Sequence, residues 1–173
     1  MKKIISMALG LGLLAGAFAA QAQAPRASPA DKVSVTMNGK AVTIDYSRPY
    51  LKGRTVGKEV APFGKVWRTG ANEATRLECA GDLMLGSLHV PAGSYSLYTI
   101  PGEGEWTLIV NKTAKQWGTV YDEKMDLGRA KMKVGKTAAP VEQLTIALEA
   151  KGSTGTLKIS WGSVEASIPV MAH

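Results

Sequence analysis

The chain has 173 residues, one cysteine, two histidines and a formal net charge of +7. The single cysteine excludes an intramolecular disulfide framework, and no Cys or His spacing matches a zinc site. The positive charge is scattered without a basic stripe, so we expect no nucleic-acid partner, no metal and no cofactor.

The first 24 residues have the features of a secretory signal peptide. Two lysines precede an apolar run at residues 4–20, and small residues permit cleavage after Ala22 or Ala24. A retained anchor would need about 20 uninterrupted apolar residues, and this run is shorter and contains three glycines. We therefore expect a soluble exported protein, periplasmic or secreted, without stable membrane insertion.

The mature chain is predicted to hold a linker at residues 25–32 and a single domain at residues 33–170. A hairpin opens this domain, because apolar residues alternate with polar ones on both sides of Asn38-Gly39. Later β-rich segments are separated by Gly or Pro. We expect strands at residues 75–80, 83–85, 88–90, 94–100, 106–111, 117–121, 129–134, 144–148, 157–161 and 164–168.

This succession of short strands predicts an all-β fold. We expect an antiparallel β-sandwich, of which the jelly roll is one form. Two stacked sheets would enclose the inward side chains. The period of two predicts the inward positions Leu77, Leu97, Leu108, Leu144, Ile146, Leu157, Ile159 and Trp161. Cys79 follows Leu77 by two residues, so we expect a buried strand residue rather than a reactive thiol.

One long irregular loop, residues 47–74, interrupts the strands. Loops of this length inside a compact domain usually have a function. Its most polar part contains Gly70 and Asn72, which tolerate left-handed backbone and allow a tight reversal. We expect this reversal to bring Arg54, Arg68 and Asn72 together with Glu73, and to pair Arg68 with Glu73.

The loop and its neighbours supply candidate ligand-binding residues. Arginine and lysine donors match carboxylate, sulfate or phosphate, and aromatic rings offer flat faces to a sugar. The candidate set is Arg48, Lys52, Arg54, Trp67, Arg68, Asn72, Glu73, Tyr98 and Trp117. The expected partner is a small anionic or glycan-like ligand.

Two other interpretations remain open for the same loop. Its polar groups could form a purely structural hydrogen-bonded network. Alternatively, Glu73 could form a catalytic carboxylate pair with Asp45 or Asp126, as in glycoside hydrolysis. No catalytic residue is assigned, because nothing in the sequence brings these carboxylates together. We favour a non-catalytic domain whose loop is structural or binds a ligand.

Several segments together resemble one known family. They are YSRP at residues 46–49 with KGR at residues 52–54, VWRTGANEAT at residues 66–75, AGSYSLY at residues 92–98, and residues 106–112 with 117–118. The chain is similar in these segments, which occur in order over most of the mature chain, to an exported bacterial family catalogued as domain of unknown function family 2911. This resemblance implies an exported β-rich domain without an established activity, so it transfers no catalytic role.

Overall fold

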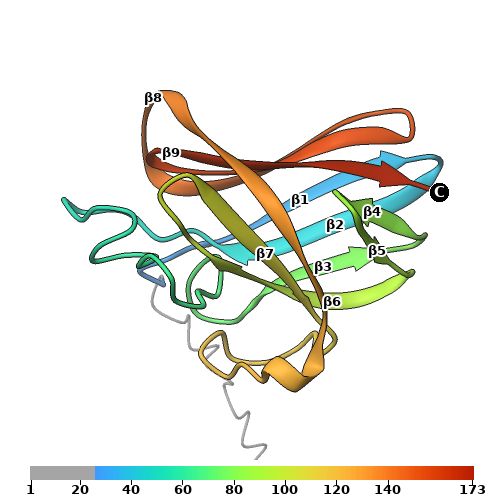
Figure 1. Ribbon diagram of the computed structural model, residues 1–173, viewed down its shortest axis with the longest axis horizontal. Coiled ribbons are helices and arrows are strands. Elements are labelled where there is room, and N and C mark those ends of the chain that lie inside the picture. Colours follow the sequence, from blue (N-terminus) through green and yellow to red (C-terminus); the bar gives the residue numbers. More distant parts are fainter. Residues whose placement is uncertain (1–25) are drawn as a thin grey trace, which may run out of the picture.

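The structure is a computed structural model that describes residues 26–173 (Figure 1). The predicted signal peptide, residues 1–24, lies outside the described residues. Within the described part the elements are β1 (Ala30–Met37), β2 (Lys40–Ser47), β3 (Thr75–Cys79), β4 (Leu83–Leu85), β5 (Leu88–Val90), β6 (Gly93–Ile100), β7 (Glu105–Asn111), the 3-10 turn η1 (Glu123–Met125), β8 (Asp126–Lys151) and β9 (Thr154–Ala172). Between residues 26 and 173, no helix is long and apolar enough to cross a membrane.

The predicted opening hairpin is present. β1 and β2 pair antiparallel, with Met37 opposite Lys40. The two residues between them, Asn38 and Gly39, have φ angles of 49° and 73°, as a tight hairpin turn requires. β1 begins at Ala30, within the segment predicted as a linker.

All strands join one antiparallel sheet in the order β1-β2-β3-β6-β7-β8-β9-β4-β5. The prediction of an all-β antiparallel fold is therefore confirmed. A sandwich or jelly roll would contain two separate sheets, and here a single sheet curls over itself. Figure 1 shows the long ribbon of β8 and β9 passing across β1 and β2. A core therefore forms between two parts of the same sheet.

The two long strands explain this difference from the prediction. β8 has 26 residues and β9 has 19, so they span the four strands expected at residues 129–134, 144–148, 157–161 and 164–168. Their pairing shifts register between Lys136 and Thr145. Gly162 in the facing strand has a φ of 62°. Such irregularities bend a strand without ending it, so each strand takes part in both layers.

The core contains all eight of the predicted inward residues, each at most 3% exposed. Cys79 is also buried, and burial raises the pKa of its thiol, in keeping with a structural role. The Tyr46 hydroxyl joins the two layers, because it accepts a hydrogen bond from the Ile146 N–H at 3.1 Å. This hydrogen bond holds β2 against β8, although the two bonded residues lie a hundred positions apart in the sequence.

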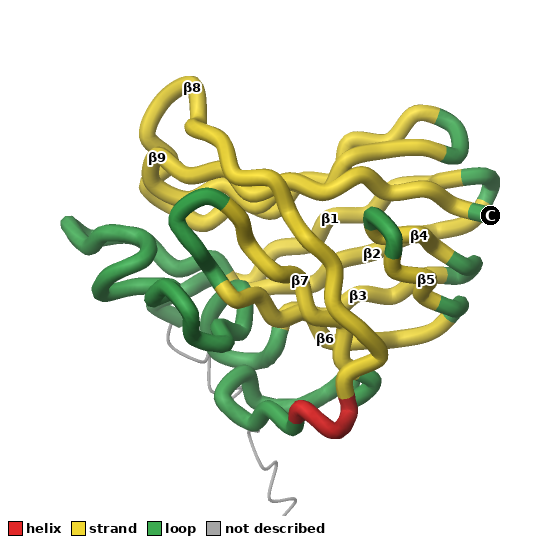
Figure 2. Tube along the Cα trace, viewed as in Figure 1, coloured by secondary structure: helices red, strands yellow, loops and turns green. Residues whose placement is uncertain are grey.

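Two loops gather at one side of the sheet, residues 48–74 and residues 112–125 (Figure 2). They are joined by backbone hydrogen bonds from Ala74 N–H to Gln116 O and from Gly118 N–H to Asn72 O, at 3.1 and 3.0 Å. Residues 117–121 were expected to form a strand. They form a turn instead, closed by the Val120 N–H on Trp117 O.

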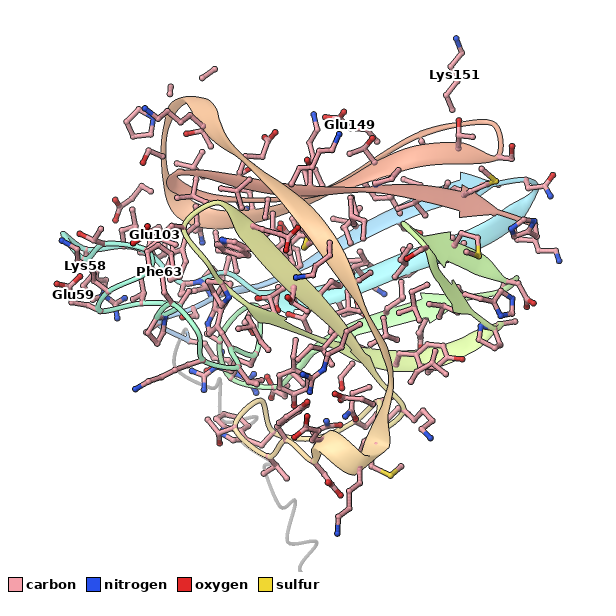
Figure 3. All side chains as sticks on the ribbon, viewed as in Figure 1. Lys58, Glu59, Phe63, Glu103, Glu149 and Lys151 are labelled. Carbon is pink, nitrogen blue, oxygen red and sulfur yellow. The ribbon has the colours of Figure 1, made fainter. Side chains whose placement is uncertain are left out.

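The outer end of the first loop is held against the turn between β6 and β7. The Gly64 N–H donates to Pro101 O at 2.9 Å. In Figure 3, Lys58, Glu59 and Phe63 lie at this outer end, close to Glu103. Trp67 and Arg68 lie further along the loop, where it returns toward β3.

Candidate functional site

The backbone around Trp67 and Arg68 is fixed by buried polar contacts. Trp67 and Thr99 exchange both backbone hydrogen bonds, at 2.8 and 2.9 Å. Thr69 is fully buried with a φ of 54°, a conformation that is strained for a β-branched residue. The Thr75 hydroxyl donates to Thr69 O at 2.8 Å and helps to hold it. Strain of this kind tends to collect at functional sites.

The chain reversal differs in detail from the prediction. Asn72 has a φ of 59°, as expected, but the other left-handed residue is Thr69 and not Gly70. Glycine is needed at position 70 because the loop backbone passes close to β2 and β3. A Cβ there would lie 3.0 Å from Ser47 O and 3.1 Å from the Thr75 hydroxyl. The reversal therefore presses the loop against the end of β2.

Three tryptophans connect this reversal to the core. Trp67 stacks on Trp161 with ring centroids 5.6 Å apart, and it meets Trp106 edge to face at 6.1 Å. Trp106 and Trp161 are almost completely buried. Trp67 is only partly buried, because its remaining surface lines a pocket.

This Arg68 pocket has a volume of about 700 Å³. The two loops form its walls, and β6 and β9 form its base. The lining residues used below are Arg54, Glu59, Trp67, Arg68, Tyr98 and Tyr121. Tyr98 and Tyr121 are in contact, with centroids 4.9 Å apart. Cationic and aromatic groups thus meet in one concave space of the size that small ligands occupy.

Arg68 is the distinctive polar group of this pocket. Its guanidinium Nε donates to Gly70 O at a long 3.3 Å, and its side chain packs over Gly118. Among residues 26–173, no carboxylate forms an ion pair with it. Glu59 lines the same pocket, but its carboxylate accepts from the Thr55 N–H at 2.9 Å, and this bond lowers the pKa of Glu59. Arg68 therefore keeps donors that a ligand could use.

The other predicted cations are mainly structural. Arg48 donates to Leu144 O and to the Thr145 hydroxyl, both at 2.9 Å. Arg54 lines the pocket, yet its Nε and Nη2 donate to backbone carbonyls of the preceding turn at 2.9 and 2.7 Å. Lys52 is exposed and has a φ of 49°. For Arg48 and Arg54, the interpretation as a structural network is the better one.

The expected pairing of Arg68 with Glu73 is wrong. Glu73 accepts from the Arg26 guanidinium at 2.8 and 2.9 Å, on the exposed surface. Its own backbone N–H and Arg26 both lower the pKa of Glu73. The reversal at Asn72 separates the two side chains, and Asn72 itself donates to Ser28 O and to the Ser47 hydroxyl at 3.2 Å. Arg68 and Glu73 therefore line two different hollows.

The second hollow, the Trp117 groove, has a volume of about 460 Å³. It lies on the other side of the strand-like contact between Glu73 and Trp117. The polar and aromatic residues that line it are Asp31, Asp45, Tyr46, Ser47, Glu73, Arg76, Lys115, Gln116 and Trp117. Trp117 is 51% exposed, the largest ring so exposed among the described residues. Of the nine candidate residues, Arg54, Trp67, Arg68 and Tyr98 line the pocket, Glu73 and Trp117 line the groove, and Arg48, Lys52 and Asn72 line neither.

The groove does contain one of the two carboxylate pairs that a hydrolase could use. Glu73 and Asp45 both line it, whereas Asp126 lies elsewhere and accepts from Asn111 and Tyr121. Burial raises the pKa of Asp45, but hydrogen bonds from Arg76 and Lys32 outweigh it and lower the pKa overall. Since Glu73 also has a lowered pKa, neither carboxyl resembles the proton donor that glycoside hydrolysis requires. No group of three metal-ligating side chains occurs within residues 26–173.

Several lining residues of these hollows were not predicted from the sequence, among them Arg76, Gln116 and Tyr121. Arg76 lies directly opposite Asp45 in the pairing of β2 with β3. The alternation of polar and apolar residues already placed both on the same outer face, so their strand register would have revealed the pair. Gln116 and Tyr121 lie in an irregular loop, where no periodicity indicates which way a side chain points.

The comparisons with known proteins identify a family. A family model described as "Protein of unknown function (DUF2911)" matches residues 28–170. No curated protein and no solved structure matches the chain. The matched region runs from the segment before β1 almost to the end of β9, so it includes both hollows. The resemblance seen in the sequence motifs is confirmed, and the chain belongs to this family, DUF2911.

Proposed function

We propose that this chain is an exported, non-catalytic β-domain that binds a small anionic ligand in the Arg68 pocket. The observation that carries the proposal is the side chain of Arg68. It is half-buried at a pocket of about 700 Å³, with one long hydrogen bond and no carboxylate partner among the described residues. A guanidinium in this position favours a carboxylate, sulfate or phosphate group, which it can hold with two parallel hydrogen bonds.

The aromatic walls add a second requirement for the ligand. Trp67 and Tyr121 line the pocket and are both partly exposed, whereas Tyr98 is 1% exposed. The Tyr121 hydroxyl donates to Asp126 at 2.7 Å, so the rings of Trp67 and Tyr121 offer the pocket mainly apolar surface. An anion attached to a flat or ring-shaped body, such as a sugar acid or an aromatic acid, would contact Arg68 and these walls together.

Export is the second part of the proposal and is supported by the N-terminal sequence. Two lysines, the apolar run at residues 4–20 and the small residues Ala22 and Ala24 favour secretion and cleavage. Mass spectrometry of the periplasmic or secreted protein should find a mature N-terminus at Gln23 or Pro25. An uncleaved chain in the membrane fraction would contradict export but leave the binding proposal standing.

The binding proposal is tested with sulfate, phosphate, glucuronate and benzoate, by calorimetric titration and thermal shift of the purified mature chain. We expect at least one of these anions to bind and to raise the melting temperature. Arg68→Gln should weaken binding about 10- to 100-fold, the effect of losing a charged hydrogen bond. Arg68→Lys should give an intermediate affinity, because the charge remains and the planar fork is lost.

Lys65→Gln is the matched control. Lys65 is exposed in the same loop and does not line the pocket, so this change removes one positive charge without touching the site. It should leave the affinity within about twofold at moderate salt, where exposed charges are screened. Equal weakening in Lys65→Gln and Arg68→Gln would show a net-charge effect and would contradict the site. Absence of binding by all four anions would contradict it as well.

A further inference from the structure

The Trp117 groove differs in chemistry from the Arg68 pocket, although the two lie side by side. Gly118 lines the pocket and Trp117 lines the groove, so adjacent residues separate them. The backbone there is firmly held by the Gly118 N–H on Asn72 O at 3.0 Å and by the Val120 N–H on Trp117 O at 2.9 Å. The backbone that carries the exposed Trp117 ring is therefore held in place by the neighbouring loop.

The carboxylates and guanidiniums of the groove are in ion pairs, and the exposed ammonium of Lys115 is the one lining cation of the described residues outside them. Asp45 accepts from Arg76 at 2.7 Å and lies 3.2 Å from the Lys32 ammonium. Arg76 also lies 3.1 Å from Glu78, and Glu73 pairs with Arg26. Each guanidinium in or beside the groove thus already has an anionic partner, in contrast to Arg68. A charged ligand would have to compete with these pairs, and the one other cation, Lys115, is exposed and screened by salt. The groove is therefore a weak site for an anion.

A hydroxyl-rich neutral ligand fits such a surface better. A hydroxyl can donate to a carboxylate and accept from a guanidinium at the same time, so it can join an existing ion pair without breaking it. The exposed indole of Trp117 supplies a flat apolar face beside these polar groups. A pyranose ring has this dual character, with C–H groups on its face and hydroxyls around its edge.

We propose that the Trp117 groove is a second binding site, which takes a neutral sugar residue of an oligosaccharide. Its ring stacks on Trp117, and its hydroxyls bind the Asp45–Arg76 pair. With about 460 Å³, the groove holds one or two sugar residues, and the rest of the oligosaccharide extends into solvent. This site is independent of the anion site, because the two hollows share none of their polar side chains.

The test titrates the mature protein with maltohexaose, cellohexaose and N-acetylchitohexaose, by calorimetry and by tryptophan fluorescence. We expect at least one of them to bind. Trp117→Ala should weaken it at least tenfold, which corresponds to about 1.4 kcal/mol. Trp117→Phe should recover part of the affinity, since a smaller ring still offers a face. The exposed ring contributes little to the core, so both variants should fold.

Two controls separate this site from the anion site. Val120 is 62% exposed in the same loop and lines neither hollow. Val120→Ala shortens this side chain, so sugar binding should not change. Arg68→Gln should also leave sugar binding unchanged, while Trp117→Ala leaves anion binding unchanged. The inference is overturned if none of the three oligosaccharides binds at millimolar concentration. It is equally overturned if Trp117→Ala binds them as tightly as the wild type.

Discussion

Trp67 stacks on Trp161, with ring centroids 5.6 Å apart and ring planes 11° from parallel. Trp67 belongs to the long loop, and Trp161 is a buried residue of β9. The loop therefore does not lie loosely over the sheet, because one of its side chains completes an aromatic cluster whose other members are core residues. This contact fixes the position of Arg68, the next residue in the chain.

Loss of the Trp67 ring should destabilise the whole domain. We expect Trp67→Ala to lower the free energy of unfolding by about 3 kcal/mol, at the low end for a large aromatic residue because Trp67 is only partly buried. A double-mutant cycle with Trp161→Leu should show about 0.5–1.5 kcal/mol of coupling. Urea denaturation measures both quantities. Trp117→Ala is the control, and its exposed ring should cost no more than about 0.5 kcal/mol.

The separation of Arg68 from Glu73 predicts that their mutations are independent. In urea denaturation, Arg68→Ala and Glu73→Ala should add without coupling, because no contact joins the two side chains. Glu73→Ala should cost at most about 1 kcal/mol, since its partner Arg26 is 55% exposed and Glu73 itself 51%. A coupling energy well above 1 kcal/mol between Arg68 and Glu73 would mean that they do form a buried pair.

The sequence predicted the regular parts of this fold and not the direction of the loop side chains. The alternation of apolar and polar residues identified every buried strand residue that we named, because alternate side chains of a strand point to the same face of the sheet. It did not show that β8 and β9 continue through their bends, since the bend at Gly162 resembles a turn between two strands. The pairing of Arg68 with Glu73 was inferred from opposite charge and from an expected reversal at Gly70 and Asn72. The left-handed residues are Thr69 and Asn72 instead, and this reversal directs the two side chains apart.

The cluster around Tyr121 should give the protein an alkaline transition. Burial, together with the hydrogen bond that Tyr121 donates to Asp126 at 2.7 Å, raises the pKa of Tyr121 to about 12. Because the pKa of Tyr121 in the folded state is above its ordinary value of 10, Tyr121 contributes fully to the free energy of unfolding below pH 10. This contribution is lost as the pH rises toward 12. Tyr121→Phe should remove this part of the pH dependence of unfolding.

At neutral pH, Tyr121→Phe should also cost about 1.5 kcal/mol, because it deletes a hydrogen bond to a carboxylate. The ultraviolet absorbance of the phenolate, recorded for the wild type and the variant between pH 9 and 12, should differ by one late-titrating group. Tyr50→Phe provides the control, since Tyr50 is 36% exposed. Loss of the late titration in Tyr50→Phe, and not in Tyr121→Phe, would show that the wrong tyrosine was assigned.

Lys52 tests whether a left-handed backbone conformation in the long loop lowers the stability of the protein. Its φ of 49° costs a non-glycine residue roughly 1–2 kcal/mol, and its side chain is exposed. Lys52→Gly removes this cost, and the greater freedom of glycine in the unfolded chain offsets about half of it. We therefore expect the variant to be more stable than the wild type by about 0.5–1 kcal/mol in urea denaturation.

Lys58→Gly is the matched control for this change. Lys58 is exposed in the same loop and has no left-handed φ, so glycine there should destabilise the protein by about 0.5–1 kcal/mol while removing the same charge. Opposite signs for the two variants would confirm that backbone strain at Lys52 is the cause. If Lys52→Gly is instead destabilising, the Lys52 side chain makes a contribution that its exposed position does not reveal. If it weakens anion binding, Lys52 belongs with Arg68 in the binding site.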